Sequence, residues 1–544
     1  MVRIWPGGVL LLSLFPLAIA GLSSAEVTKD DAMATLSVTV HEPGSNTPLP
    51  CRAWVQAGQQ RLFNPSTTGC TPYPKDRSFS CDGQFSIRVP PGKAVIHVER
   101  GKEYWPVDQQ VEVDAGQPRE VAVELKRWVN MCQEGWYSAD MHVHFGNGAP
   151  QTLRQLALAD DVNYVPVFSL WTQYAEQWPQ WEKGPVVQAD PTHTATMANE
   201  EIERIGGGPF ESVGALFIFG VARPVFVPRH DRRYPCDAAL QRIAKQTSPE
   251  CIIDTDKPVW AENVVGVGLG LFDSVQVCHN HYHRETTLPP GYGMAGALTE
   301  DEKHLGKDEL FVRTNAVYYR WLNCGFRLSV TGGSAMGVMP VPLGYCRTYA
   351  TLDGPFNEAS YLKAIRDGRT FATAGPMLVL TADGKAPGAV VEWTTGKSQP
   401  IQIRADVRSI QQLDALEVVY NGEVVKRADL SGTPVSGVLK QTVELPLEPK
   451  RSGWVAARAV YQSPPGHLRQ AHTSPVYIAV DGKPTAFRQD AEYMIRWVDE
   501  ILKVSAQPAR YATAADRLEV QAIFKEARRV YEGIARTARE VWGD

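Results

Sequence analysis

The chain of 544 residues is too long for one ordinary hydrophobic core, and its length predicts about three or four domains. Hydrophobic residues make up 44% and charged residues 21% of it, which is the composition of a globular protein and excludes a disordered chain. The formal net charge is only -5, and no run of Lys and Arg is long enough to follow a phosphate backbone, so we expect no nucleic-acid partner.

The first residues have the layout of a secretory signal peptide. Arg3 supplies a positive charge, an apolar run covers residues 9–20, and small residues suited to cleavage follow. We therefore expect residues 1–25 to be removed and the mature protein to be secreted or periplasmic, with no stable membrane span. An uncleaved anchor is the alternative, although the run is short for crossing a bilayer.

Nine cysteines follow this segment. Export permits disulfides, and Cys70 with Cys81 and Cys236 with Cys251 bracket short polar loops, which makes them candidate pairs. Spacing does not fix the connectivity, and the odd number leaves at least one thiol unpaired. Because no Cys-x-x-Cys pair is present, a zinc site made of thiolates is not expected.

Residues 34–128 are predicted to form a β-sandwich. Leu36, Val38 and Val40 alternate with polar residues, which is the period of a strand with one buried face. Further short apolar runs are separated by Gly, Pro and Asn, as in small sandwiches. The pattern resembles the carboxypeptidase-regulatory-like sandwiches that precede many secreted enzymes.

Residues 131–376 have a different pattern. Strand-like apolar runs alternate with segments compatible with helices, and this alternation favours an α/β barrel or an open sheet, with the chemistry at the carboxyl ends of the strands. The strand-like runs cover residues 164–170, 214–219, 264–271 and 274–277.

Residues 377–482 are predicted to be a β domain, and residues 486–544 a helical tail. Asn421 and Gly422 separate two strand-like runs and predict a hairpin, because both residues tolerate a positive φ. Two apolar stripes at helical spacing predict a pair of helices packed on the β domain. The stripes are Met494, Trp497, Val498, Ile501 and Leu502, then Val520, Ile523, Phe524, Ala527, Val530, Tyr531 and Ile534.

The residues best suited to chemistry are Asp140, His142 and His144. On a strand their spacing places all three side chains on one face. Two imidazoles two residues apart can chelate one divalent ion, while a nearby carboxylate either joins the ligands or orients a ring. A glycine-rich exit at residues 146–148 adds to the pattern. A structural pair of histidines is the alternative.

Residues 135–144 resemble the opening motif of the CehA/McbA-like branch of the PHP (polymerase and histidinol phosphatase) metallohydrolases. Residues 199–201 resemble the segment whose second carboxylate, here Glu201, bridges metals in that family. Segments at 322–334, 344–349 and 364–376 resemble its later motifs. The resemblance covers about residues 132–390. It implies a central PHP-type distorted (β/α) barrel, flanked by the N-terminal β-sandwich and by the C-terminal β domain with its helical tail.

Three positions depart from that family. Where it carries metal ligands, this chain has Ala215, Lys257 and Ala335, so the resemblance implies no multinuclear centre. The residues left to hold one divalent ion, zinc or manganese, are His142, His144 and Glu201, with Asp140 in support.

Two further features are candidate parts of the site. His279, His281 and His283 follow the apolar run that ends at residue 277; we expect them to replace lost ligands or bind substrate, with solvated loop histidines as the alternative. Arg347 is, together with Asp140, a candidate catalytic residue, and we expect it to bind an anionic substrate. A structural arginine is the alternative.

The resemblance implies a secreted metal-dependent hydrolase. It would act on a small-molecule ester, carbamate or phosphoester through a metal-activated water. The alternative is a catalytically degenerate barrel that serves as a binding or structural module, and the replacements at Ala215, Lys257 and Ala335 motivate it.

Overall fold

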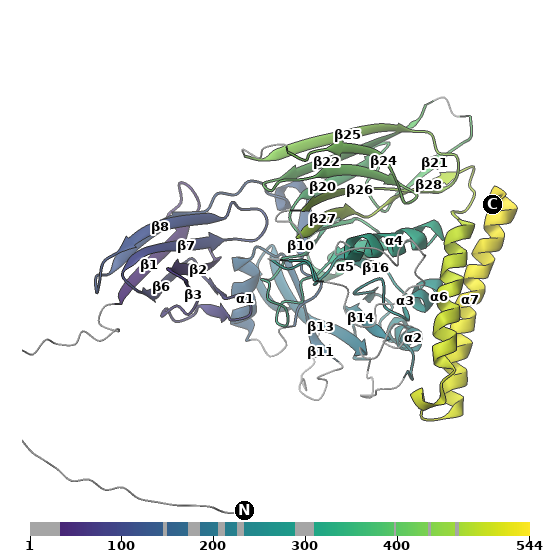
Figure 1. The fold of residues 1–544 in the computed structure, drawn as a ribbon, viewed down its shortest axis with the longest axis horizontal. Helices are drawn as coiled ribbons and strands as arrows, with labels where there is room; N and C mark the ends of the chain where they lie inside the picture. The colour runs from purple at the N-terminus through teal and green to yellow at the C-terminus, as the bar shows by residue number, and fades with distance from the viewer. Residues whose placement is uncertain are drawn as a thin grey trace, which may run out of the picture.

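The computed structural model describes residues 33–144, 149–171, 185–204, 213–225, 233–284, 286–288, 309–396, 399–432, 437–462 and 467–544. The predicted signal peptide at residues 1–25 and the glycine-rich exit at 146–148 lie outside the described residues. The chain is mostly β, with 40% strand and 22% helix. Figure 1 shows the N-terminal strands at one end of the molecule and two long helices at the other. No helix in the described ranges has the length and apolar character needed to cross a membrane.

The N-terminal β domain consists of two sheets around one apolar core. The predicted alternation is present, because Leu36, Val38 and Val40 of β1 are buried between more exposed neighbours. One sheet has the order β6-β1-β9 and the other the order β4-β5-β2-β7-β8, with β3 beside β2. The strands are β1 (Ala34–His41), β2 (Cys51–Ala57), β3 (Gln60–Leu62), β4 (Thr71–Tyr73), β5 (Ser78–Cys81), β6 (Gln84–Val89), β7 (Gly92–Glu99), β8 (Val107–Val113) and β9 (Arg119–Glu124).

The predicted central (β/α) barrel is wrong. Among the described residues the strands form one open series, β17-β16-β15-β14-β13-β11-β10-β18-β19, and no closed barrel is present. The strands of this series are β10 (Trp136–Ala139), β11 (Tyr164–Trp171), β13 (His193–Arg204), β14 (Gly214–Phe219), β15 (Ile252–Asp254), β16 (Ser274–Cys278), β17 (Ser329–Gly332), β18 (Arg347–Thr351) and β19 (Thr370–Thr373).

The physical reason is strand direction. A (β/α) barrel needs parallel strands, each followed by a helix. Here β12 (Pro185–Asp190) and β13 form an antiparallel hairpin, and β13 with β14, β14 with β15 and β10 with β18 are also antiparallel. Apolar runs in the sequence predict where strands lie, but they do not predict whether neighbouring strands are parallel or antiparallel.

The helices of the central region lie beside this sheet (Figure 1). They are α1 (Pro150–Ala159), α2 (Asp237–Thr247), α3 (Asn263–Gly268), α4 (Glu309–Asn323) and α5 (Glu358–Arg366). The run at residues 264–271, predicted to be a strand, begins as α3. A short, fully buried apolar run has no periodicity that separates helix from strand. Its glycines allow close packing, since a Cβ at Gly268 would lie 2.7 Å from the Tyr531 ring.

The C-terminal β domain continues the central sheet, because β19 pairs with β27, and β26 and β23 follow. A second sheet has the order β20-β22-β25. The predicted hairpin is confirmed: Asn421 and Gly422 have φ of 52° and 93° and join β23 to β24. The strands are β20 (Met377–Ala382), β21 (Val390–Trp393), β22 (Ile401–Ser409), β23 (Ala415–Tyr420), β24 (Glu423–Asp429), β25 (Leu439–Leu447), β26 (Gly453–Gln462), β27 (Leu468–Thr473) and β28 (Val476–Val480).

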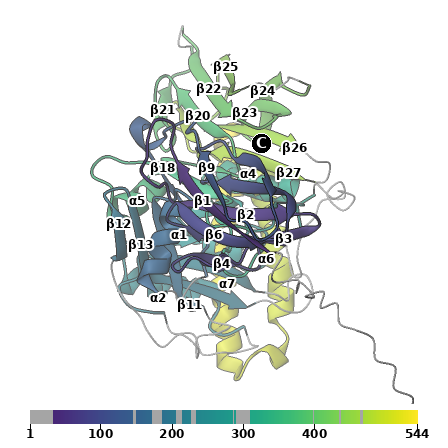
Figure 2. The same cartoon turned by 90° about the vertical axis from the view of Figure 1, so that its left-hand side faces the viewer.

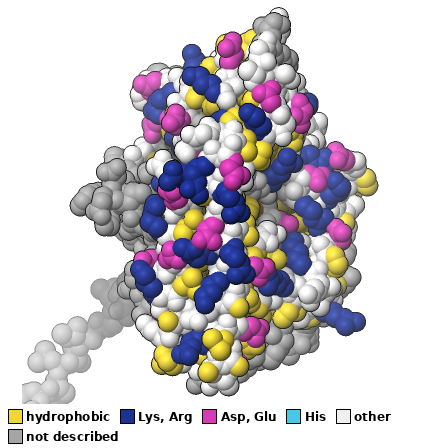
Figure 3. Space-filling view, turned by 90° about the vertical axis from the view of Figure 1, so that its right-hand side faces the viewer, with side chains coloured by type: hydrophobic (Ala, Val, Ile, Leu, Met, Phe, Trp, Pro, Cys, Tyr) yellow, Lys and Arg dark blue, Asp and Glu magenta, His cyan; other side chains and the backbone are white. Residues whose placement is uncertain are grey.

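The two predicted C-terminal helices are present as α6 (Arg488–Ser505) and α7 (Ala514–Trp542), but they do not pack mainly on the β domain. Trp497 Nε1 donates to Ala261 O at 3.1 Å, and Tyr531 Oη donates to Val264 O at 2.8 Å. Most residues of their apolar stripes therefore complete the core of the central region, whereas Val530 of the predicted second stripe is 37% exposed. On the opposite face, Lys and Arg side chains are spread among Asp and Glu (Figure 3).

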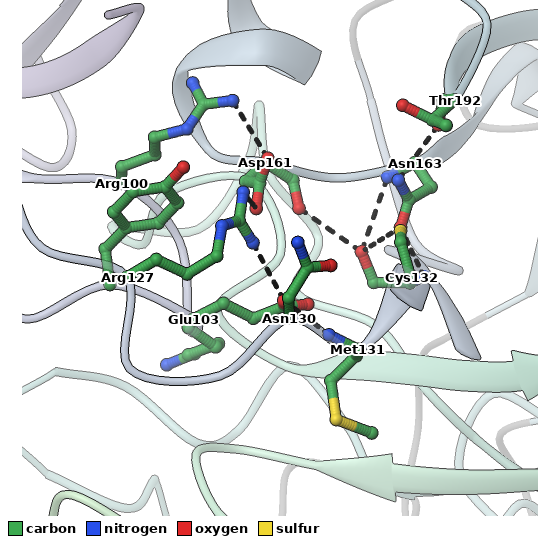
Figure 4. A network of polar contacts seen from close by, with 12 residues as sticks. Arg100, Glu103, Arg127, Asn130, Met131, Cys132, Asp161, Asn163 and Thr192 are labelled. Atoms are coloured by element: carbon green, nitrogen blue, oxygen red, sulfur yellow. Dashed lines mark hydrogen bonds and ion pairs between the residues drawn. The ribbon is translucent and has the colours of Figure 1, made fainter. Parts of the chain in front are cut away.

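Buried charges join the N-terminal domain to the central region, whose α1 lies against the N-terminal strands (Figure 2). Arg100 and Arg127 both reach Asp161, at 2.9 and 3.0 Å, and Arg127 also contacts Glu103 at 2.9 Å (Figure 4). Burial opposes ionisation of Asp161, yet the guanidinium groups hold its pKa well below the usual range. Burial and the charge of Asp161 raise the pKa of Glu103 to about 7.

Candidate metal centre

The segment after β10 carries both histidines of the predicted motif. Val143 is bridged to Val167 on one side and to Met336 on the other, and both bridges are parallel. Val143 is turned into the apolar core, whereas the rings of its neighbours His142 and His144 lie on the opposite face of this extended segment. The local spacing of the sequence therefore brings the two imidazoles together.

Asp140 fixes the backbone around this segment. Its Oδ1 accepts hydrogen bonds from the amides of His142, at 3.1 Å, and Ser334, at 2.8 Å, and its Oδ2 accepts from Gly344 at 2.7 Å. Burial raises the pKa of Asp140 to about 6 in spite of these amides. Because both oxygens are engaged with the backbone, Asp140 positions His142 and is not one of the grouped ligands.

Glu201 on β13 completes the group. His142 Nε2 lies 2.8 Å from His144 Nε2, and the Glu201 carboxylate lies 3.2 Å from His144 Nε2 and 4.0 Å from His142 Nε2. One potential ligand atom from each residue lies within 4.8 Å of the other two, and all three side chains are buried. These three residues could hold a metal ion.

The protonation states suit a cation. Burial lowers the pKa of His142 well below its usual value, and burial with the charges of Lys75 and Lys257 lowers that of His144 to about 3. Both rings are therefore neutral, which is the form that binds metals. Burial raises the pKa of Glu201, and Glu201 Oε2 has no hydrogen-bond donor. A buried carboxylate in this state gains from an adjacent positive charge.

The surrounding charges add a second argument. Glu203 and Asp256 both raise the pKa of Glu201, whereas Lys257 lowers it. Lys257 Nζ lies 2.8 Å from Asp256 Oδ2, and Asp256 Oδ1 lies 3.6 Å from His142 Nδ1. Burial raises the pKa of Glu203 as well as that of Glu201, so a divalent ion beside them would favour the ionised form of carboxyls that burial otherwise keeps neutral. The donor set and its charge therefore fit one divalent cation.

The three positions at which the PHP resemblance implies ligands add none to this group. Ala215 stands opposite Glu203 in the pairing of β13 with β14, and Ala335 is buried with φ of 54°. Neither offers a ligand atom. Lys257 brings a fixed positive charge, which disfavours a second cation. Within the described residues, the three-residue cluster is the single group with metal-binding geometry.

The second histidine cluster lies outside the ligand group. His279 and His281 contribute to the lowered pKa of His142, so they lie near it, but neither belongs to the three. His279 Nε2 is 3.4 Å from Thr314 Oγ1, and His283 Nε2 is 3.0 Å from Asn280 O. All three histidines are buried, so the alternative of solvated loop residues is wrong.

Arg347 is bound to the backbone. Its Nε donates to Gly344 O at 2.7 Å, Nη1 to Asp161 O at 2.8 Å and Nη2 to Asp160 O at 2.5 Å. The side chain is fully buried. This placement favours the structural alternative over the predicted catalytic role and substrate clamp.

Asp256 and Glu203 lie near the site but are not among the residues predicted from the sequence. Asp256 directly precedes the recognised Lys257, and Glu203 follows Glu201 by two residues on the same strand, a spacing that places both on one face. That spacing was the available signal for Glu203. For Asp256 there was none, because its role depends on Lys257 and on Trp260, whose Nε1 donates to Asp256 Oδ2 at 2.9 Å.

Comparison with known proteins gives no family for this arrangement. No protein-family model matches the sequence, and no curated protein matches it. The likeness of residues 135–144 to the PHP opening motif stays a prediction.

Proposed function

We propose that the protein is a secreted metal-dependent hydrolase that acts on a small-molecule ester, carbamate or phosphoester. The observation that carries the proposal is the convergence of His142, His144 and Glu201 on one buried point. Three protein ligands leave a coordination position open, which is the arrangement of catalytic rather than structural zinc sites. The likeness of the motif to that of PHP metallohydrolases adds support, although the predicted barrel is not present.

A divalent ion held there, zinc or manganese, supplies Lewis-acid chemistry and lowers the pKa of water to about 7. The chain's own residues prepare that position. The two neutral imidazoles offer nitrogen lone pairs, and Glu201 offers a carboxylate oxygen whose ionised form a bound cation would favour. Asp256 Oδ1 lies 3.6 Å from His142 Nδ1, too far for a hydrogen bond but on the side of the ring from which a carboxylate can orient a ligating histidine.

The second candidate is a degenerate module without catalysis. It is favoured by Lys257, whose buried ammonium already offsets part of the acidic charge, and by the two alanines at former ligand positions, Ala215 and Ala335. In this case the group would hold no ion, and the buried charges would be structural.

Elemental analysis of protein purified without a His tag separates the two. After dialysis against zinc or manganese and removal of free metal, we expect one equivalent per chain and turnover on a panel of esters, carbamates and phosphoesters. No retained metal would favour the degenerate module. Two or three equivalents would contradict the charge argument, and one equivalent without turnover would reduce the proposal to a metal-binding protein.

A further inference from the structure

A cavity of about 240 Å³ lies where the N-terminal β domain, the central region and the C-terminal β domain meet. Its described lining includes Lys102 from the first, Arg284 and Tyr345 from the second, and Tyr461 and Arg469 from the third. No residue of the metal-binding group lines it. The cavity is therefore a separate feature that the proposed hydrolase activity does not use.

Positive charge dominates the described wall. Lys102, Arg284 and Arg469 line the cavity, with Glu99 as the one carboxylate among its described lining residues. That carboxylate is already engaged, because Arg284 binds it through both terminal nitrogens and also binds Asp76 at 2.7 Å. Arg284 is thus neutralised within the wall, and two cations remain.

Among the described residues, Lys102 and Arg469 contact only neutral partners. Lys102 Nζ donates to Ala374 O at 3.1 Å and lies 4.3 Å from the centre of the Tyr345 ring. Arg469 is 1% exposed and donates to hydroxyl and carbonyl oxygens, among them Tyr345 Oη at 3.1 Å. No ion pair with a carboxylate joins either side chain in the described parts of the chain.

This arrangement leaves charge uncompensated. Burial, with the nearby charges of Arg347 and Arg284, lowers the pKa of Lys102 to about 7. Lys102 is half-buried, and a cation partly removed from water without an anionic partner is unfavourable. The Lys102 ammonium has three N–H donors, and two of them have no acceptor among the described residues. An oxygen of a bound ligand could accept hydrogen bonds from these two donors.

We propose that this cavity binds a small free oxyanion, a compound with a carboxylate or phosphate group, between Lys102 and Arg469. The volume sets the size class, because pockets for drug-sized ligands occupy roughly 300–1,000 Å³ and this cavity is smaller. Ligands of the size of inorganic phosphate or citrate fit that limit. Since the wall comes from three regions of the chain, a bound anion also joins them.

The test is calorimetric titration with inorganic phosphate and, separately, with citrate, both at an ionic strength matched with sodium chloride. The key variant is Lys102→Met, which keeps the length of the side chain and removes the charge. We expect its dissociation constant for the preferred anion to rise about tenfold or more, and Lys102→Arg to restore most of the affinity. Comparison of the dissociation constants of phosphate and citrate identifies whether the cavity prefers a phosphate or a carboxylate group.

Lys385→Met is the matched control. Lys385 is exposed and its Nζ also donates to one backbone carbonyl, Val390 O, at 2.8 Å, but it lies outside the cavity. We expect this variant to bind as the wild type does. Equal affinity of wild type and Lys102→Met, or no saturable binding of either anion by wild type, would overturn the proposal. Metal content serves as a separate readout, because Lys102→Met should leave it unchanged whether or not the hydrolase proposal holds.

Discussion

Replacing Glu201 by Gln tests the metal centre with the smallest change in shape. The carboxylate is buried, and its Oε2 lies 3.2 Å from His144 Nε2 without a hydrogen-bond donor. The amide keeps the volume, removes one negative charge and removes one of three ligands. Even partners outside the ligand set change metal affinity by about 10–100-fold. We therefore expect Glu201→Gln to weaken zinc binding by at least about 100-fold.

That loss has a measurable effect on stability. At a free metal concentration of 100 times the wild-type dissociation constant, binding stabilises the folded wild type by about 2.7 kcal/mol. If affinity falls 100-fold, the same concentration stabilises the variant by only about 0.4 kcal/mol. Urea denaturation with buffered zinc and with a chelator measures both differences. Without metal, we expect the variant to be at least as stable as the wild type near neutral pH, because a buried carboxyl with a raised pKa has been removed.

Glu200→Gln is the control. Glu200 is the preceding residue of the same strand, is also buried, and accepts a hydrogen bond from Val225 N at 2.8 Å, which a Gln oxygen can accept as well. We expect it to bind zinc as the wild type does. If Glu201→Gln retains full zinc affinity, or if both variants lose it equally, Glu201 is not a ligand and the reasoning fails.

Three other predictions concern residues away from the ligands. Arg347→Met should lower the free energy of unfolding by at least about 2 kcal/mol, because buried carbonyls lose their donor. Its zinc affinity should equal that of the wild type. A variant with unchanged stability but altered catalysis would instead support the predicted role of Arg347 in substrate binding. Burial lowers the pKa of Lys102 from 10.5 to about 7. In the absence of anions, the folded chain therefore binds fewer protons than the unfolded chain between these two pH values. Its free energy of unfolding should rise from pH 7 to 10 relative to that of Lys102→Met. Urea denaturation that finds the same pH dependence of the free energy of unfolding in both proteins would contradict this. Cys81 contacts both Cys51, whose Sγ is 3.6 Å away, and Cys70, and all three are free thiols. Because the pairing of β2 with β5 holds Cys51 directly opposite Cys81, we expect oxidation to link these two, and peptide mapping that finds Cys70 bound to Cys81 would refute it.

Local patterns predicted the elements that depend on neighbours in sequence. The alternation of β1 and the Asn421–Gly422 hairpin follow from side-chain period and backbone φ, and both are present. The apolar stripes of α6 and α7 were also visible. Their packing partner could not be predicted, because a stripe can pack on any apolar surface. The run that forms α3 was predicted as a strand for another reason, since all its residues are buried and it has no amphipathic period.

The site shows the same division. The spacing of His142 and His144 brought two ligands together without any knowledge of the fold, since alternate residues share a face. The resemblance, not the spacing, selected Glu201 from residues 199–201. The environment of Arg347 could not be predicted, because its acceptors Asp160 and Asp161 are almost 190 residues away in sequence. Charge balance around Lys257 likewise depends on contacts between distant segments.

The pairing of β19 with β27 has a consequence for how the chain comes apart. Because this ladder joins the central sheet to the C-terminal strands, a cut between residues 376 and 377 would leave β19 with a free edge of unpaired amides and carbonyls. Exposed edges of this kind recruit other chains and promote aggregation. We therefore expect neither half to fold stably alone and both to melt in one cooperative transition. Calorimetry should therefore find equal van't Hoff and calorimetric enthalpies for this part of the molecule, and limited proteolysis should not release a stable fragment that ends at residue 376.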